Sequence, residues 1–270
     1  MAADFLDLHR PAAGFVLPNA WDAGTAKILE HVGFPALATT SAGIAFAAGR
    51  PDGGLDRETT LDRVAAIVEA VGCPVSADLE AGYGADAEEV AVTFERAVSV
   101  GVVGANVEDA VPGARGTLFE IGEAVERVAA ARGCAPRGSF VLNARTDTYL
   151  AARANADRDR LFDQTVERAE QYVAAGADCV FVPGVDDGDT IRRLADAVPA
   201  PLNIVAGLTA EVLDAATLRS LGVARISVGG SLARAMLAYV ERAGREMLTE
   251  GTFRFATDAI PHAEMQQRFA

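Results

Sequence analysis

The chain has 270 residues, of which half are hydrophobic and 23% are charged, and its formal net charge is −14. This composition supports a large buried core without disulfides, and the acidic excess argues against a nucleic-acid partner because it repels phosphate groups. Without a membrane-length apolar stretch of ~18 residues or a signal-peptide pattern, we expect a soluble cytoplasmic protein with no membrane contact.

Short apolar runs alternate with longer amphipathic segments along the whole chain. The first run, "GFVLP" (14–18), precedes a helical segment over 23–33 whose last residue, Gly33, suits a helix C-cap. Further runs predict strands at 36–40, 73–79, 102–109, 139–145, 179–184, 202–207 and 225–230. Amphipathic patterns between them predict helices at 57–72, 85–101, 121–133, 159–176, 189–198, 209–222 and 231–251.

Eight strands, each followed by a helix, predict a (β/α)8 TIM-type barrel that spans residues 1–270 as a single domain. The strand runs are near-continuous and apolar, as a parallel sheet covered by helices requires. The alternative, an open doubly wound sheet, would carry a glycine-rich phosphate loop where this chain has "LPNAWDAG". Residues 251–270 include Phe253, Phe255, Ile260 and Met265, so we expect a C-terminal segment packed on a neighbouring subunit or on the barrel floor.

Polar side chains gather where the predicted strands end, which is where such barrels place their active residues. They are Asp52, Asp78, Glu80, Glu108, Asp109, Asn143, Arg145, Asp147 and Asn203. Several acids around one opening cannot all stay ionised without a cation. Mg²⁺ takes oxygen ligands, needs only one or two direct carboxylates and lets other acids hold its waters. We therefore expect a Mg²⁺ site, with Mn²⁺ as an alternative, and Arg145 facing a substrate carboxylate through a bidentate fork.

Some of these acids also have a purely structural interpretation. Asp109 and Asp147 suit the roles of loop caps or partners of neighbouring arginines, and we favour that interpretation for both. Asp52 lies in "GRPDGG", which is also a turn signal. For these three residues the position in the chain alone does not require a binding role.

The other residues of this group also have a structural and a functional interpretation. Arg145 is open to a structural ion pair, although its position at a strand end favours ligand binding. Asn203 is able to satisfy hydrogen bonds in the barrel core. Asp78 and Glu80 are harder to explain structurally, because residues two apart on a strand point to the same side.

Three motifs, in this order and spacing, resemble the isocitrate lyase/phosphoenolpyruvate mutase superfamily: "ADLEAGYG" (77–84), "GANVEDA" (104–110) and "NARTDTYL" (143–150). The resemblance runs from "LPNAWDAGTAKI" to "RISVGG", and the chain looks most like the short, single-domain members. It implies a modified (β/α)8 barrel whose last helix is swapped between the subunits of a homo-oligomer, a tetramer or a dimer.

The same resemblance implies a set of site residues and a chemistry. The implied metal ligands are Asp78 directly and, mainly through water, Asp52, Glu80 and Glu108. The implied substrate-binding residues are Arg145, Ser41 and Gly43 in "TTSAGIA", and Asn203. In this family a small 2-oxo acid chelates Mg²⁺, and the metal stabilises the enolate that forms when a bond next to it breaks.

The chain also departs from the family at the positions that select the reaction. The loop after the fourth strand reads "EDAVPGARGTLFE" and lacks both the Lys-Arg-Cys-Gly-His segment of the lyases and the asparagine of the phosphonate mutases and hydrolases. The lyases carry a glutamate where "VFVPGV" offers Gly184 or Val185. Arg115 remains in the loop and would bring a charge over the substrate on closure.

The leading hypothesis is a Mg²⁺-dependent lyase or decarboxylase acting on a small 2-oxo acid or its adduct, with Arg145, Glu108 and Arg115 as catalytic residues. The alternatives are P–C bond chemistry on phosphonopyruvate or phosphoenolpyruvate, and a 2-oxo acid-binding protein without catalysis. A hydrolase with Ser41 as its nucleophile is disfavoured, because no histidine in the central body is available as the base.

Overall fold

The computed structural model describes residues 1–10, 14–153, 155–209 and 213–270. It confirms the predicted barrel: the strands follow the order β1-β9-β8-β7-β6-β5-β4-β3-β2, and neighbouring strands are parallel. Their bounds are β1 (Phe15–Leu17), β2 (Asn19–Ala20), β3 (Leu37–Thr39), β4 (Val75–Asp78), β5 (Gly104–Glu108), β6 (Val141–Arg145), β7 (Cys179–Phe181), β8 (Leu202–Val205) and β9 (Arg225–Ser227).

The barrel closes through one extended segment that a proline interrupts. Only Pro18 separates β1 from β2, and β1 pairs with β9 while β2 pairs with β3. Proline has no N–H to donate to a ladder, so the segment divides there, although its carbonyl still accepts from the N–H of Ala38 at 2.9 Å. The extended segment, predicted to end at residue 18, therefore runs to Ala20 as two short strands. Asn19 in the second of them reaches the cavity at the carboxyl end.

The helices predicted between the strands are confirmed. They are α2 (Ala23–Val32), α4 (Arg57–Ala70), α5 (Ala87–Ser99), α6 (Ile121–Gly133), α8 (Arg158–Ala175), α9 (Gly188–Ala197), α10 (Ala215–Ser220) and α11 (Ser231–Thr249). Residues 210–212 of the helix predicted over 209–222 lie outside the described residues. Local chemistry sets the helix ends: Gly33 ends α2 with a φ of 104°, and Asp56 accepts from the N–H of Thr59 at the start of α4.

Several shorter helices were not predicted, namely α1 (Ala2–Leu8), α3 (Ser41–Ala47), α7 (Thr148–Ala151), the 3₁₀ helix η1 (Arg254–Ala256) and α12 (His262–Phe269). α1 lies at the amino ends of the strands, where Phe5 meets His9 and Phe15 edge to face. α3 starts just after β3 and α7 just after β6, so both lie at the carboxyl end of the barrel. The amino end is thus filled by aromatic rings, and the carboxyl end carries the polar side chains.

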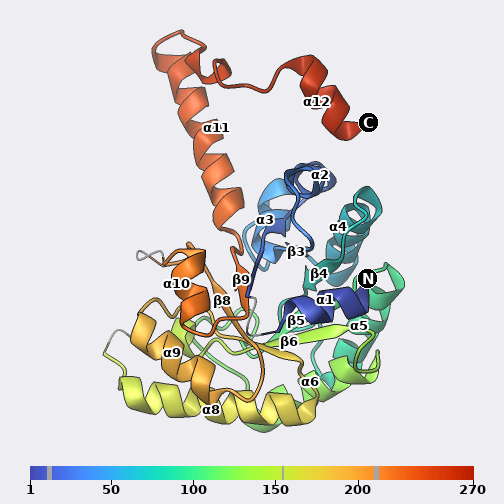
Figure 1. The fold of residues 1–270 in the computed structure, drawn as a ribbon, viewed down its shortest axis with the longest axis vertical. Helices are drawn as coiled ribbons and strands as arrows, with labels where there is room; N and C mark the ends of the chain where they lie inside the picture. The colour runs from blue at the N-terminus through green and yellow to red at the C-terminus, as the bar shows by residue number, and fades with distance from the viewer. Residues whose placement is uncertain (11–13, 154, 210–212) are drawn as a thin grey trace.

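The C-terminal part of the chain leaves the barrel and returns to it. α11 extends away from the barrel (Figure 1) and exposes large hydrophobic side chains, among them Met236, Leu237 and Val240. α12 then lies against α2, where Lys27 Nζ is 3.4 Å from the carbonyl oxygen of Phe269. Of the helices in the described residues, none combines the length and the apolar character needed to cross a bilayer.

Candidate active site

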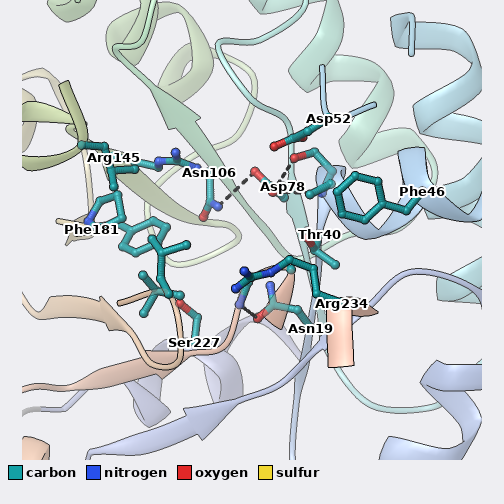
Figure 2. A pocket seen from close by; sticks show the side chains of 18 of the residues that line it. Asn19, Thr40, Phe46, Asp52, Asp78, Asn106, Arg145, Phe181, Ser227 and Arg234 are labelled. Atoms are coloured by element: carbon teal, nitrogen blue, oxygen red, sulfur yellow. Dashed lines mark hydrogen bonds between the residues drawn. The ribbon is translucent and has the colours of Figure 1, made fainter. Parts of the chain in front are cut away.

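The carboxyl ends of the strands surround a cavity of about 340 Å³ (Figure 2). Its polar lining residues are Asn19, Thr40, Ser41, Asp52, Asp78, Asn106, Arg145, Arg225, Ser227 and Arg234. A second cavity of about 300 Å³ shares Ser41, Asp52 and Arg145 with the first, so the two form one site. It adds Glu80, Glu108 and Arg115. Of the nine residues predicted to bind metal, bind substrate or act in catalysis, the structure brings seven together: Ser41, Asp52, Asp78, Glu80, Glu108, Arg115 and Arg145. The other two, Gly43 and Asn203, line neither cavity.

Asp78, the last residue of β4, presents its carboxylate to the first cavity. Its Oδ2 accepts hydrogen bonds from the backbone N–H and the hydroxyl of Ser41, at 3.0 and 2.9 Å. Its Oδ1 makes a longer contact of 3.4 Å with Nδ2 of Asn106 (Figure 2). One carboxylate oxygen is therefore held firmly by the protein, while the other retains lone pairs for a ligand.

Glu80 follows β4 in a tight turn. Glu80 and Tyr83 have φ angles of 51° and 53°, which residues other than glycine rarely adopt. The turn brings the Tyr83 hydroxyl within 2.9 Å of Glu80 Oε1, to which it donates. The strand predicted over 73–79 ends earlier, at Asp78, so the turn and not strand alternation brings Glu80 near Asp78.

Burial and neighbouring charges disfavour the ionisation of three acids around the opening. Burial, followed by the charge of Asp78, raises the pKa of Glu80 to about 7. Partial desolvation and then the same charge raise the pKa of Asp52. Burial raises the pKa of Glu108 well above its usual value, although Arg145 opposes the shift. A group of acids in this state is stabilised when a divalent cation neutralises it.

This oxygen-rich donor set fits a hydrated Mg²⁺ ion. Within the described ranges, no three His, Cys, Asp or Glu side chains converge into a complete metal cage. Mg²⁺ does not need one, because it keeps several waters and uses one or two carboxylates. Asp78 and Asp52 line one cavity, and Glu80 and Glu108 line the adjoining one. The arrangement suits an ion bound by one carboxylate and hydrated toward the others.

Arg145 ends β6 and lies across the cavity from Asp78 (Figure 2). Two acids hold its guanidinium group. Its Nε and Nη2 donate to the two carboxylate oxygens of Asp147 at 2.6 and 2.8 Å. Its Nη1 lies 2.8 Å from Oε2 of Glu108. We expected the paired N–H groups of Arg145 to face a substrate carboxylate, but Nε and Nη2 face Asp147 instead. The interpretation of Asp147 as an arginine partner is confirmed. Hydrogens on Nη1 and Nη2 remain for a ligand.

Arg115 lies in the loop between β5 and α6. An antiparallel bridge between Ala110 and Leu118 closes the base of this loop, and the N–H of Val111 donates to the carbonyl of Thr117 at 3.0 Å. The tip of the loop borders the second cavity. Arg115 is therefore placed at the rim of the acidic part of the site.

Gly43 is buried inside α3, and its N–H is directed to the hydroxyl of Thr40 at 3.3 Å. A Cβ at this position would lie 2.6 Å from Cγ2 of Thr40 and 2.8 Å from Cβ of Trp21. The glycine is therefore needed for the close packing of α3. In this segment it is the N–H of Ser41 that faces Asp78.

Asn203 lies beneath the site, fully buried in β8. Its Nδ2 donates to the carbonyls of Ile204 and Arg225 and to the hydroxyl of Ser227, and its Oδ1 accepts from Asn143. Asn143 also donates to Oδ1 of Asn106 at 2.8 Å. Because Asn106 contacts Asp78, a chain of amides links Asn203 to the site from below.

Two arginines at this site were not predicted. Arg225, the first residue of β9, is 1% exposed, and burial lowers its pKa to about 10. Its Nη2 lies 3.5 Å from the hydroxyl of Ser76 inside the barrel. Arg234 of α11 reaches the carbonyl of Gly207 at 3.2 Å and borders the cavity (Figure 2). The sequence offers a signal for Arg225, because it is a charged residue at the start of the otherwise apolar strand "RISVGG".

The sequence matches the family model of phosphoenolpyruvate phosphomutase over residues 5–248. The chain belongs to this family. The predicted membership of the isocitrate lyase/phosphoenolpyruvate mutase superfamily is confirmed by this match, which covers most of the chain. It also agrees with the parallel barrel that the strands form.

Known proteins and solved structures resemble most or all of the chain. A 2,3-dimethylmalate lyase of Eubacterium barkeri is 34% identical over 82% of this chain and 77% of its own. The crystal structure of a Burkholderia cenocepacia J2315 protein is 44% identical, has a TM-score of 0.91 and covers 100% of this chain and 95% of that one. Phosphonopyruvate hydrolase, crystallised with oxalate and Mg²⁺, shares the fold with a TM-score of 0.85 at 23% identity, over 99% of this chain and 94% of its own.

Proposed function

We propose that this protein is a Mg²⁺-dependent lyase or decarboxylase that breaks a C–C bond in a small 2-oxo acid or its adduct. The observation that carries the proposal is the group of mutually repelling acids around Asp78, which faces Arg145 across one cavity. A bound divalent ion would supply positive charge where the oxo oxygen becomes negative during bond cleavage. The likeness to 2,3-dimethylmalate lyase supports this reaction type.

The acidic side chains have separate roles in the proposal. Asp78 binds the ion directly, and its free Oδ1 lone pairs are suited to this task. Asp52, Glu80 and Glu108 hold the waters of the ion. Glu108 has a second role, because its ion pair with Arg145 joins the acidic part of the site to the basic part.

The remaining residues hold the substrate. Arg145 binds its acid group through the free hydrogens of Nη1 and Nη2. Ser41 would bind the carboxylate next to the oxo group by turning its N–H and hydroxyl from Asp78 Oδ2 to that group, with Gly43 allowing α3 to approach. Asn203 acts from below through the amide chain, and Arg115 adds positive charge from the loop.

A substrate panel of oxaloacetate, 2,3-dimethylmalate and 2-methylisocitrate, with Mg²⁺ and with a chelator, tests this proposal. We expect Mg²⁺-dependent turnover of at least one compound. Asp78→Ala should lower its kcat/KM about 100- to 1000-fold, which is the usual effect of losing one electrostatic stabiliser. Asp62→Ala, at an exposed acid of α4, is the matched control. Unchanged turnover in Asp78→Ala would rule out the metal assignment.

P–C bond chemistry on phosphonopyruvate or phosphoenolpyruvate is a second candidate, and the match to the phosphoenolpyruvate phosphomutase model favours it. Phosphorus NMR of a reaction with phosphonopyruvate separates the two. Loss of the phosphonate signal would support the second candidate, and its persistence beside Mg²⁺-dependent oxaloacetate turnover would support the first. Binding of 2-oxo acids without any turnover would indicate a non-catalytic binder.

We further propose that residues 1–270 form one barrel domain that works in the cytoplasm as a homo-oligomer, a tetramer or a dimer. The exposed hydrophobic side chains of α11 support its exchange between subunits. Residues 251–270 would then be the packing segment that brings the chain back to α2. Light scattering measures the assembly, and a monomer at every protein concentration would contradict the exchange.

A further inference from the structure

A buried carboxylate lies directly behind Arg145. Asp109, the residue after β5, is 2% exposed and lines neither cavity of the site. Its Oδ1 accepts a hydrogen bond from the backbone N–H of Asp147 at 2.8 Å. Its Oδ2 accepts from the hydroxyl of Tyr172 at 2.7 Å and from Nη1 of Arg168 at 3.0 Å. The interpretation of Asp109 as an arginine partner is therefore confirmed, and its contacts go further than one ion pair.

The two side chains that hold Asp109 come from the outer layer of the barrel. Arg168 and Tyr172 lie four residues apart on α8, so they share one face of the helix. They are 6% and 1% exposed, and Arg168 Nη1 also donates to the Tyr172 hydroxyl at 3.1 Å. Polar side chains buried to this extent are held in one geometry by their partners. Asp109 is thus anchored to α8 and not only to its own loop.

The same contacts reach the base of the loop that carries Arg115. Nη2 of Arg168 donates to the carbonyl of Phe119 at 2.9 Å, and the N–H of Phe119 donates to the carbonyl of Asp109 at 2.8 Å. Phe119 directly follows the bridge that closes this loop. The anchored carboxylate therefore fixes two segments of the site, the one after β5 and the one after β6.

The direction of Arg145 depends on this arrangement. Asp147 holds Nε and Nη2 of Arg145, and these two contacts determine which hydrogens are left to face the cavity. Asp147 in turn is fixed by the hydrogen bond from its backbone N–H to Asp109. Binding groups act only within narrow limits of distance and angle, so a displaced Asp147 would turn Arg145 away from its ligand.

We propose that Asp109, held by Tyr172 and Arg168, is a positioning residue that sets the direction in which Arg145 presents its free N–H groups to the acid group of the substrate. The inference rests on the proposed function, because it takes Arg145 as the anion-binding residue. Asp109 itself touches no substrate. Its effect passes through Asp147 to Arg145.

Calorimetry with oxalate as the probe, at saturating Mg²⁺, tests the proposal. Tyr172→Phe keeps the ring and removes one hydrogen bond to Asp109, so we expect oxalate to bind about three- to tenfold more weakly. The affinity for Mg²⁺ alone should stay within about twofold. Tyr149→Phe is the matched control, because the buried Tyr149 hydroxyl has no hydrogen-bond partner among the described residues. Asp109→Asn is less suitable, because it removes the charge that pairs with Arg168 and risks unfolding.

A double-mutant cycle separates positioning from a general structural effect. In an Arg145→Lys background, Tyr172→Phe should change oxalate affinity by less than about 1.5-fold, because the residue through which it acts is gone. An equal loss in both backgrounds, or no loss in the wild-type background, would overturn the inference alone. If the wild-type protein fails to bind oxalate in the presence of Mg²⁺, the proposed function falls and the inference falls with it.

Discussion

The two walls of the cavity differ in how their charges are balanced. On the β6 wall, Arg145 is held by two carboxylates, and Asp109 behind it accepts hydrogen bonds from three donors. On the β4 wall, the charge of Asp78 adds to burial in raising the pKa of Glu80 to about 7. The chain therefore balances one wall with its own side chains, whereas the other wall keeps an excess of negative charge that a bound cation would neutralise.

The largest expected effect on stability comes from replacing Arg145, the positively charged residue of the β6 wall. Arg145→Gln leaves the carboxylates of Glu108 and Asp147, 14% and 10% exposed, without a cation. Breaking such a pair typically costs about 3–5 kcal/mol, and we expect urea denaturation to show a loss near the lower value. Arg63→Gln, at an exposed position of α4, should stay within about 0.5 kcal/mol. A loss below about 1 kcal/mol for Arg145→Gln would show that the β6 wall does not depend on this pair.

Removing a charge from the β4 wall should have the opposite sign. Glu80→Gln relieves the cost of ionising a half-buried acid next to Asp78, so the metal-free protein should gain roughly 1–3 kcal/mol at about pH 8. Denaturation in the presence of a chelator measures this gain. Glu69→Gln, on the exposed face of α4, serves as the matched control. Destabilisation by Glu80→Gln under these conditions would mean that the acids of this wall are already neutralised within the chain.

The pH dependence of stability reports the same raised pKa on this wall, spread over a range of pH. The folded-state pKa of Glu80 is raised from 4.5 to about 7, so the folded chain retains a proton that the unfolded chain releases between these values. The resulting stability is complete below pH 4.5 and is lost as the pH rises through about 7. We expect Glu80→Gln to flatten the profile by up to about 1.4 kcal/mol per pH unit in that window. Parallel profiles for the variant and the wild type would contradict the raised pKa.

The fold and most of the site were accessible from the sequence, because both depend on where apolar runs begin and end. The carboxyl ends of parallel strands meet at one opening, so the order of Asp78, Glu108 and Arg145 was enough to bring them together. The interruption at Pro18 was missed because the apolar run over 14–18 predicts a single strand. The segment instead forms two short strands with different neighbours, since β1 pairs with β9 and β2 pairs with β3. The turn at Glu80 was missed because glycine is the usual sequence signal for a left-handed backbone conformation, and here a glutamate adopts it.

The partners of the site residues were harder to predict, since they depend on side-chain directions beyond the strand ends. Nothing in "NARTD" decides whether Arg145 turns toward Asp147 or toward a substrate. The sequence also does not show that Asn203 points into the amide chain, or that Arg168 and Tyr172 reach inward from α8 to a loop on the barrel. The contacts of Asp109 with Asp147, Arg168 and Tyr172 join residues 38 to 63 positions apart, which spacing within one motif cannot indicate.

Calorimetric titration of the wild-type protein with oxalate, with and without Mg²⁺, is the most direct test of the site. We predict that Mg²⁺ binds first, that oxalate binds only when the metal is present, and that Asp78→Ala abolishes both events. Oxalate binding of equal strength with and without the metal would contradict this assignment. So would a wild-type protein that takes up neither Mg²⁺ nor Mn²⁺.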